Sequence, residues 1–98
     1  MDIRYVLNGI VFVWNEQKAQ INRRKHDGVT FEQAAEVFFD PFVKIVDASR
    51  ELEAREAAIG LDRKWNLLFV VHVIREGEQI RVISARRATR QERQAYEV

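Results

Sequence analysis

The run Trp65–Ile74 constrains the fold most, because it is the most apolar stretch of the sequence. Successive side chains of a β-strand point to opposite faces of a sheet. Here both sets of alternate positions are apolar, namely Leu67, Phe69, Val71 and Val73, and Leu68, Val70 and Ile74. A strand of this kind is typical of the buried centre of a sheet. The run therefore predicts a central strand that is covered on both sides.

The N-terminal part predicts a β-hairpin that leads into a helix. Two β-rich runs, Ile3–Leu7 and Ile10–Trp14, are separated by Asn8-Gly9. This dipeptide favours a two-residue type I′ turn, in which both residues need positive φ. Asn15 is a suitable N-cap for a helix over residues 16–26.

The stretch Asn22–Phe31 predicts the end of that helix and the start of another. Gly28 is expected to be the left-handed residue that ends the first helix. Thr30 and Gln33 form a capping-box pattern that begins a second helix over about residues 31–39. The two helices are therefore consecutive and meet at a tight corner.

The second half of the chain changes to a period of two, which indicates strands. Besides the central run, we expect strands at Phe42–Ala48, Arg55–Leu61 and Ile80–Arg86, and a short C-terminal helix opened by a Thr89/Glu92 capping box and running to about Glu97. Successive hairpins with three helices predict an α+β fold. Its sheet should be mostly antiparallel with about six strands, in a single domain over residues 1–98.

The charges are distributed unevenly along the 98 residues, although the net charge is only +1. Residues 27–56 carry three Lys or Arg and eight Asp or Glu, whereas the segments on both sides are basic. If the two basic ends meet, they form a surface that attracts phosphate groups. The chain has no cysteine, so disulfides and thiolate metal sites are excluded. No long apolar run or leader pattern is present, which predicts a cytoplasmic protein that does not enter a membrane.

The two histidines are candidates for chemistry, but each also has a structural explanation. His26 lies between Lys25 and Asp27 at a helix end, where it could act as a general base, bind phosphate or complement the helix dipole. His72 lies in the apolar central run, where a histidine is more often a hydrogen-bonded core residue. A metal pair would need a third ligand beside them. We therefore expect neither a metal nor a cofactor.

Arg86 and Arg87 are adjacent near the end of a predicted strand, so their side chains should point to opposite faces. By the same alternation, Arg81 shares a face with Arg87, and Arg86 shares one with Ser84. Basic runs of this kind suit RNA, DNA or an acidic protein. The sequence has no Gly-rich phosphate loop, His-Glu-x-x-His helix or serine nucleophile elbow, which argues against nucleotide hydrolases, zinc proteases and α/β-hydrolases.

A set of segments spread over nearly the whole chain carries a family resemblance. In order they are Phe12–Asn15, Lys18, Asn22, Lys25-His26, Gly28–Glu32, Val37-Phe38, Asp40, Glu53, Arg55, Gly60, Leu68–Val71 and Arg81–Thr89, followed by Glu92, Arg93 and Tyr96. With these segments the sequence resembles the BrnT family of type II toxins. The resemblance implies a RelE-like fold and a ribonuclease that acts on RNA and inhibits translation. It also implies a partner protein, a BrnA-type antitoxin. Any contact with DNA would be made only through the complex of toxin and antitoxin.

The resemblance directs attention to the chemistry of RNA cleavage by the neighbouring 2′-hydroxyl. That reaction needs a base for the hydroxyl proton, cations for the charge that develops at phosphorus and an acid for the 5′ leaving oxygen, without a metal. We assign these roles to six residues: Arg55 and Arg86 as cations, Glu53 to orient Arg55, Lys25 and His26 for proton transfer or phosphate positioning, and His72 as a secondary candidate. The expected RNA-binding residues are Lys18, Asn22, Arg24, Arg81 and Arg87.

The charge distribution also supports a competing hypothesis. A non-catalytic module could use the same basic surfaces to bind a protein or a nucleic acid. Growth arrest on expression, and its relief by substitution of the expected catalytic arginines, would distinguish the enzyme from such a module.

Overall fold

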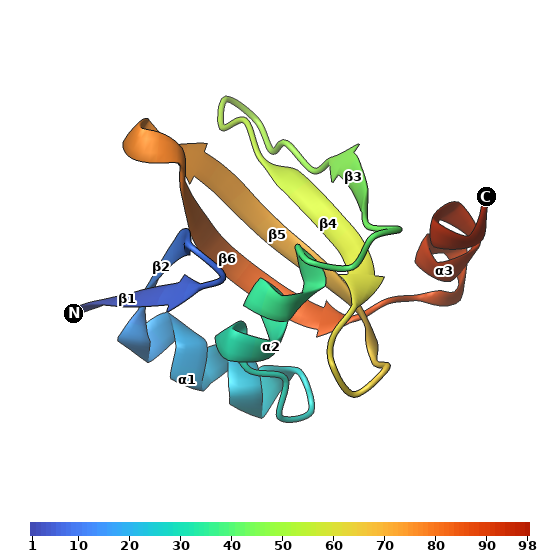
Figure 1. The fold of residues 1–98 in the computed structure, drawn as a ribbon, viewed down its shortest axis with the longest axis horizontal. Helices are drawn as coiled ribbons and strands as arrows, with labels where there is room; N and C mark the ends of the chain where they lie inside the picture. The colour runs from blue at the N-terminus through green and yellow to red at the C-terminus, as the bar shows by residue number, and fades with distance from the viewer.

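The computed structural model describes residues 1–98 with the exception of the Glu76 side chain. It is an α+β fold in which two of the three helices cover one face of a single six-stranded sheet (Figure 1). The elements are, in order, β1 (Asp2–Leu7), β2 (Ile10–Asn15), α1 (Glu16–Lys25), α2 (Phe31–Val37), β3 (Lys44–Asp47), β4 (Glu56–Leu61), β5 (Leu67–Arg75), the short 3-10 helix η1 (Glu76–Glu78), β6 (Gln79–Arg87) and α3 (Arg90–Glu97). Within the described part of the chain, no helix has the length and apolar content needed to cross a bilayer.

The strands lie in the order β1-β2-β6-β5-β4-β3, and all neighbours are antiparallel except β2 and β6. The predicted α+β fold with a mostly antiparallel sheet is therefore confirmed. Strand β5 is interior to the sheet, as its apolar sequence predicted. The prediction that it is covered on both sides is wrong, because helices α1 and α2 lie on one face only and Phe69 and Val71 on the other face are half-buried. The strand begins at Leu67, because Trp65 is part of the preceding turn and has a φ of 67°.

The local signals at the N-terminus act as predicted. Asn8 and Gly9 have φ values of 50° and 81°, as a type I′ turn requires. The side chain of Asn15 caps α1 by accepting a hydrogen bond of 3.0 Å from the backbone N–H of Lys18. Strand β2 therefore passes into α1 without a loop.

The end of α1 differs by one residue from the prediction. The C-cap is His26, so the left-handed residue directly after it is Asp27, with a φ of 55°. Gly28 is also left-handed, and its N–H donates to the carbonyl of Arg23 at 2.8 Å. Such a six-residue closure is the hydrogen bond of a Schellman motif. Asp27 is thus accommodated in the turn, because Gly28 allows the second positive φ.

The start of α2 confirms the predicted capping box. The Thr30 side chain accepts from the Gln33 N–H at 3.0 Å, and the Gln33 side chain accepts from the Thr30 N–H at 2.9 Å. The helix ends at Val37, two residues earlier than predicted. The following turn is fixed by Asp40, whose carboxylate accepts hydrogen bonds from the N–H groups of Phe42 and Leu61. Strand β3 therefore begins only at Lys44.

We call the sheet face covered by α1 and α2 the helix face, and the other one the opposite face. The core lies between the helix face and these two helices (Figure 1). Its buried side chains include Phe12, Trp14, Phe31, Ala34, Val37, Ala58, Leu68, Val70 and Ala85. The rings of Trp14 and Phe31 meet edge to face, with 5.7 Å between their centroids. This packing joins β2 to the first residue of α2.

One edge of β6 is completed by a side chain instead of a strand. Strands β2 and β6 pair only at Phe12–Ile80 and Val13–Arg81, after which β2 turns into α1. Beyond this point the Asn22 amide of α1 accepts from the Ala85 N–H at 3.1 Å and donates to the Ala85 carbonyl at 2.8 Å. Asn22 is only 5% exposed, so these backbone groups would otherwise be buried without partners.

A β-bulge changes the predicted faces of the arginines. Val71 pairs with Ser84 and His72 with Val82, which leaves Ile83 as an extra residue in β6. The alternation therefore reverses between Arg81 and Arg87. Arg81 lies on the opposite face, together with Arg86, and Arg87 lies on the helix face. The prediction that Arg81 and Arg87 share a face is wrong, because strict alternation assumes a strand without a bulge.

We expect Asn22→Ala to lower the free energy of unfolding by about 3 kcal/mol, because the Ala85 N–H and carbonyl lose buried partners. Urea unfolding followed by circular dichroism measures this change. Gln20→Ala, an exposed substitution on the same helix, should change stability by less than about 0.5 kcal/mol. Equal effects of the two substitutions would show that the Asn22 contact contributes nothing specific.

Candidate functional site

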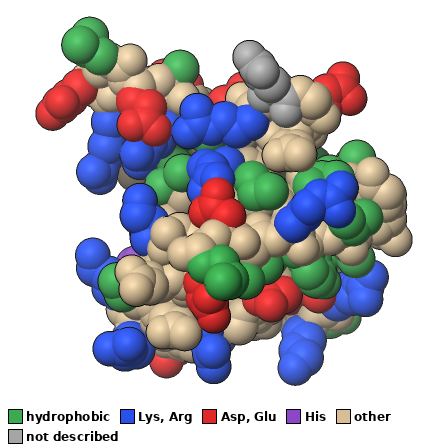
Figure 2. Space-filling model, turned by 90° about the vertical axis from the view of Figure 1, so that its left-hand side faces the viewer, with side chains coloured by type: hydrophobic (Ala, Val, Ile, Leu, Met, Phe, Trp, Pro, Cys, Tyr) green, Lys and Arg blue, Asp and Glu red, His purple; other side chains and the backbone are tan. Residues whose placement is uncertain are grey.

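A polar hollow of about 570 Å³ opens where β2 and β6 separate. Charged side chains from distant parts of the sequence line it: Asp2, Lys18, Glu53, Arg55, Arg75 and Arg81. Cations outnumber anions in this set, so the hollow attracts negatively charged ligands. Figure 2 shows this side of the molecule, where Lys and Arg side chains gather with Asp and Glu side chains between them.

The loop between β3 and β4 brings Arg55 and Glu53 to the hollow. Arg50 and Glu53 exchange two backbone hydrogen bonds, of 3.0 and 2.8 Å, which close the tip of the loop. Arg55 Nε donates to Glu53 Oε1 at 3.0 Å. This hydrogen bond lowers the pKa of Glu53, and the charges of Arg75 and Lys18 add to the effect. Glu53 is therefore ionised at neutral pH and holds one edge of the guanidinium.

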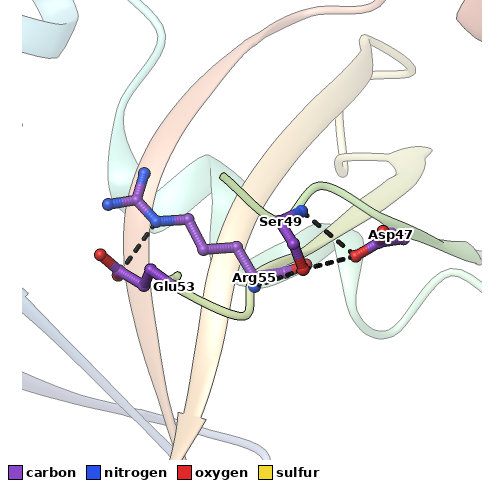
Figure 3. A network of polar contacts seen from close by, with 4 residues as sticks. All are labelled: Asp47, Ser49, Glu53 and Arg55. Carbon is purple, nitrogen blue, oxygen red and sulfur yellow. Dashed lines mark hydrogen bonds and ion pairs between the residues drawn. The ribbon is translucent and has the colours of Figure 1, made fainter. Parts of the chain in front are cut away.

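The backbone of Arg55 is fixed by Ser49 and Asp47 (Figure 3). The Arg55 N–H donates to Ser49 Oγ at 3.2 Å, and that hydroxyl donates to Asp47 Oδ1 at 2.6 Å. The sequence predicted that this strand begins at Arg55. These contacts explain why β4 begins one residue later, at Glu56. In Figure 3 only Nε of the Arg55 guanidinium is joined to Glu53, and neither Nη atom has a marked contact with the residues drawn. The Nη edge of the guanidinium has the two-donor geometry that suits a phosphate group.

Arg81 reaches the hollow from β6. Its Nη2 donates to Asp2 Oδ2 at 2.6 Å, and this hydrogen bond lowers the pKa of Asp2. Arg75, at the end of β5, lines the same hollow. The sequence reasoning missed Asp2 and Arg75. Arg75 could have been found from strand alternation. It follows Val73 by two residues and so lies on the same face of the strand, and Val73 is the residue that pairs with Arg81 across the hairpin.

Arg86 lies outside the hollow and is held by α3. Its guanidinium makes a two-pronged ion pair with Glu92, with distances of 2.8 and 2.9 Å, and lies 4.5 Å from the centre of the Phe69 ring. Pairing with Glu92 raises the pKa of Arg86. On β5, Arg86 pairs with Phe69 and Arg81 pairs with Val73. These partners are four residues apart, so Arg86 lies roughly 13 Å along the sheet from Arg81. The catalytic role assigned to Arg86 stays a prediction.

His72 is buried on the helix face and is only 1% exposed. Its Nδ1–H donates to the carbonyl of Val70 at 3.1 Å, and its Nε2 lies 3.7 Å from Glu56 Oε1. The ring meets Phe38 edge to face at 4.7 Å. Burial lowers the pKa of His72. Because RNA on the surface cannot reach this ring, the structure favours the core interpretation of His72.

The remaining predicted site residues are divided among three places. Asn22 is buried, and its amide is used by Ala85 and by the Val29 carbonyl, so its role in the structure is to join α1 to β6. Lys25 and His26 end α1, outside the hollow, and Lys25 is exposed.

Arg24 and Arg87 lie near the corner between α1 and α2. Arg24 lines a separate shallow hollow beside Gly28. Arg87 donates to Asn66 Oδ1 at 2.9 Å and is 3.9 Å from the Asp27 carboxylate. The structure thus brings together Lys18, Glu53, Arg55 and Arg81 of the predicted set. Among the described residues, no three His, Cys, Asp or Glu side chains are grouped to hold a metal ion.

Comparison with known protein families agrees with the sequence resemblance. The family described as ribonuclease toxin, BrnT, of type II toxin–antitoxin system matches residues 14–92. The chain belongs to the BrnT family. The match covers most of the chain and includes Lys18, Glu53, Arg55, Arg75 and Arg81. Membership implies ribonuclease activity, an RNA substrate and an antitoxin partner. Among curated proteins, no sequence matches the chain significantly.

We expect stability to decline as the pH falls below about 6.5, because the unfolded chain then binds a proton at His72 more readily than the folded one. His72→Phe keeps a ring beside Phe38 and should remove this decline. Thermal unfolding at pH values between 7 and about 5.5, where carboxylates stay largely ionised, measures the difference. Parallel curves for the two proteins would contradict a neutral buried His72.

Proposed function

We propose that this BrnT-family ribonuclease is an endoribonuclease that binds and cleaves RNA in the hollow between β2 and β6. The observation that carries the proposal is the meeting of Lys18, Arg55, Arg75 and Arg81 in one hollow. Four cations from four parts of the chain repel each other, and only two carboxylates, Asp2 and Glu53, accompany them. A polyanion such as RNA relieves this repulsion when it binds.

The proposed reaction needs charge stabilisation above all. The 2′-oxygen attacks the neighbouring phosphorus as its proton leaves, and the bond from phosphorus to the 5′-oxygen breaks as that oxygen gains a proton. The products are a 2′,3′-cyclic phosphate and a 5′-hydroxyl. Arg55 and Arg81 are suited to stabilise the charge on the phosphoryl oxygens, because guanidinium groups bind such oxygens in pairs. Glu53 and Asp2 then act by orienting these guanidinium groups.

Lys25 and His26 remain our candidates for proton transfer or for a neighbouring phosphate. Lys25 follows Lys18 by two helical turns, or about 11 Å, and so lies on the same side of α1. RNA that extends from the hollow along α1 would reach it. This pathway needs no metal ion.

The proposed cellular consequence is inhibition of translation in the cytoplasm, through loss of the RNA that is cleaved. A BrnA-type antitoxin would neutralise the toxin, and any contact with DNA would be made through the complex of the two. The cations of the hollow alone would also suit a binding protein without activity, so cleavage must be tested directly.

We expect Arg55→Ala to reduce RNA cleavage by about a hundredfold, because one donor to the developing charge is lost. The test incubates purified protein with a labelled RNA in the presence of EDTA, and determines the cleavage rate and the chemical termini of the products. Cyclic phosphate termini in EDTA support the mechanism. In cells, the same substitution should relieve growth arrest.

Arg63→Ala is the matched control for this experiment, since Arg63 is exposed at the other end of β4. It should cleave RNA like the wild type. Circular dichroism establishes that both variants fold. Intact RNA with folded wild-type protein, both with and without ribosomes, would refute the ribonuclease proposal. Full activity of Arg55→Ala would refute the site.

We expect Arg75→Ala to weaken RNA binding and to lower its dependence on salt. Each phosphate contact to a single strand contributes about 0.7 to the slope of log affinity against log salt concentration. Titrations of single-stranded RNA at several salt concentrations, under conditions that prevent turnover, measure this slope. An unchanged slope would mean that Arg75 contacts no phosphate.

A further inference from the structure

A second, largely apolar groove of about 330 Å³ lies at the other end of the sheet. The β1–β2 turn, the end of α2 and the β4–β5 turn form its walls, and all three lie on the side of the molecule that carries α2 (Figure 1). Its apolar lining comes from Leu7, Phe39, Pro41, Leu61 and Trp65. A groove of this size suits one or two anchoring side chains of a partner.

Trp65 is displayed at this groove by a rigid turn. It is 80% exposed, whereas Trp14 is only 2% exposed, and its φ of 67° is unfavourable for a residue with a side chain. The buried Asp62 carboxylate holds the turn by accepting from the N–H groups of Lys64 and Asn66, each at 2.9 Å. It also accepts from the Gln33 side chain of α2 at 3.0 Å. The fold therefore fixes a strained backbone that exposes a large ring, which is typical of functional positions.

The charges around the groove disfavour RNA as its ligand. Three acidic residues, Glu36, Asp40 and Asp62, line it together with one cation, Arg63. Burial would raise the pKa values of Asp40 and Asp62, but hydrogen bonds outweigh this effect and keep both acids ionised. The excess of negative charge repels phosphate and attracts Lys or Arg. It also disfavours a symmetric contact with a second copy, which would bring the same acidic groups together.

We infer that the Trp65 groove is a docking site for a basic amphipathic segment of the antitoxin, which places an apolar side chain beside Trp65 and Phe39 and a Lys or Arg near Glu36. The identity of the partner rests on the proposed function, because a toxin of this class acts with an antitoxin. The location and chemistry of the contact rest on the groove itself.

This docking site is remote from the hollow that we propose for RNA. Arg75 ends β5 and Trp65 lies in the turn before it, so the length of β5, nine residues or roughly 26 Å, separates them. Substitution of Trp65 should therefore leave the rate of RNA cleavage unchanged. This separation allows antitoxin binding and ribonuclease activity to be measured as independent properties.

The test uses two probes with the full-length toxin. The first is a labelled helical peptide made of Leu and Lys. Its matched control is the same peptide with every Lys replaced by Glu. The second is the protein encoded by the adjacent reading frame. Fluorescence anisotropy and the wavelength of tryptophan emission report binding. The variants are Trp65→Ala and Glu36→Lys, and the control is Ile21→Ala, an exposed apolar side chain on α1 that is 55% exposed.

We expect the Leu-Lys peptide to bind the wild type and to shift its tryptophan emission to the blue. Trp65→Ala should bind both the peptide and the adjacent-frame protein about tenfold more weakly. Glu36→Lys should also weaken both, Ile21→Ala should weaken neither, and all three variants should cleave RNA at the wild-type rate.

Equal binding by Trp65→Ala and wild type would overturn the inference, as would equal binding of the Glu peptide. Weaker RNA binding by Trp65→Ala, or conversion of a wild-type dimer to a monomer, would assign the groove to RNA or to self-association instead. If the wild type binds both probes as expected but cleaves no RNA, the docking site stands and the proposed function fails.

Discussion

The side-chain amide of Asn22 substitutes for a β-strand, and the rest of the architecture depends on this contact. Strand β2 leaves β6 after two paired positions, because the chain must turn into α1. The Asn22 amide then satisfies the N–H and carbonyl of Ala85. As a result, α1 lies along β6, and Lys18 of α1 reaches the hollow between β2 and β6. The hollow exists because the sheet opens at this place without leaving buried polar groups unpaired.

The two ends of the sheet carry opposite charges, which a net charge of +1 conceals. Arg55 precedes β4 and Arg75 ends β5, so both lie at the basic end. Leu61 ends β4 and Trp65 precedes β5, so both lie at the acidic groove. Antiparallel neighbours place the end of one strand beside the start of the next. The fold thus separates the hollow that we propose for RNA from the groove that we propose for the antitoxin.

The arginines illustrate how a small irregularity redirects a surface. The bulge at Ile83 places Arg81 and Arg86 on the same face, although they are five positions apart in sequence and strict alternation would put them on opposite faces. They nevertheless have different environments, since Asp2 holds Arg81 at the hollow and Glu92 holds Arg86 beneath α3. A carboxylate on each guanidinium fixes its direction and remains ionised at neutral pH. Position on a face is thus not sufficient to assign an arginine to the site.

The sequence alone determined the local structure and the family. Local sequence sets the Asn8-Gly9 turn, the helix caps at Thr30 and Thr89 and the apolar interior strand. Each depends on residues within a few positions of each other, so each could be predicted from a short stretch of sequence. Tertiary structure decided which charges meet. Arg75 joins Arg55 in the hollow, and Trp65 is exposed at a groove, because strand register, a bulge and the Asn22 contact bring distant segments together. Such contacts depend on the whole chain. Alternation within one hairpin places Arg75 and Arg81 on one face, but no local pattern brings Arg55 to them.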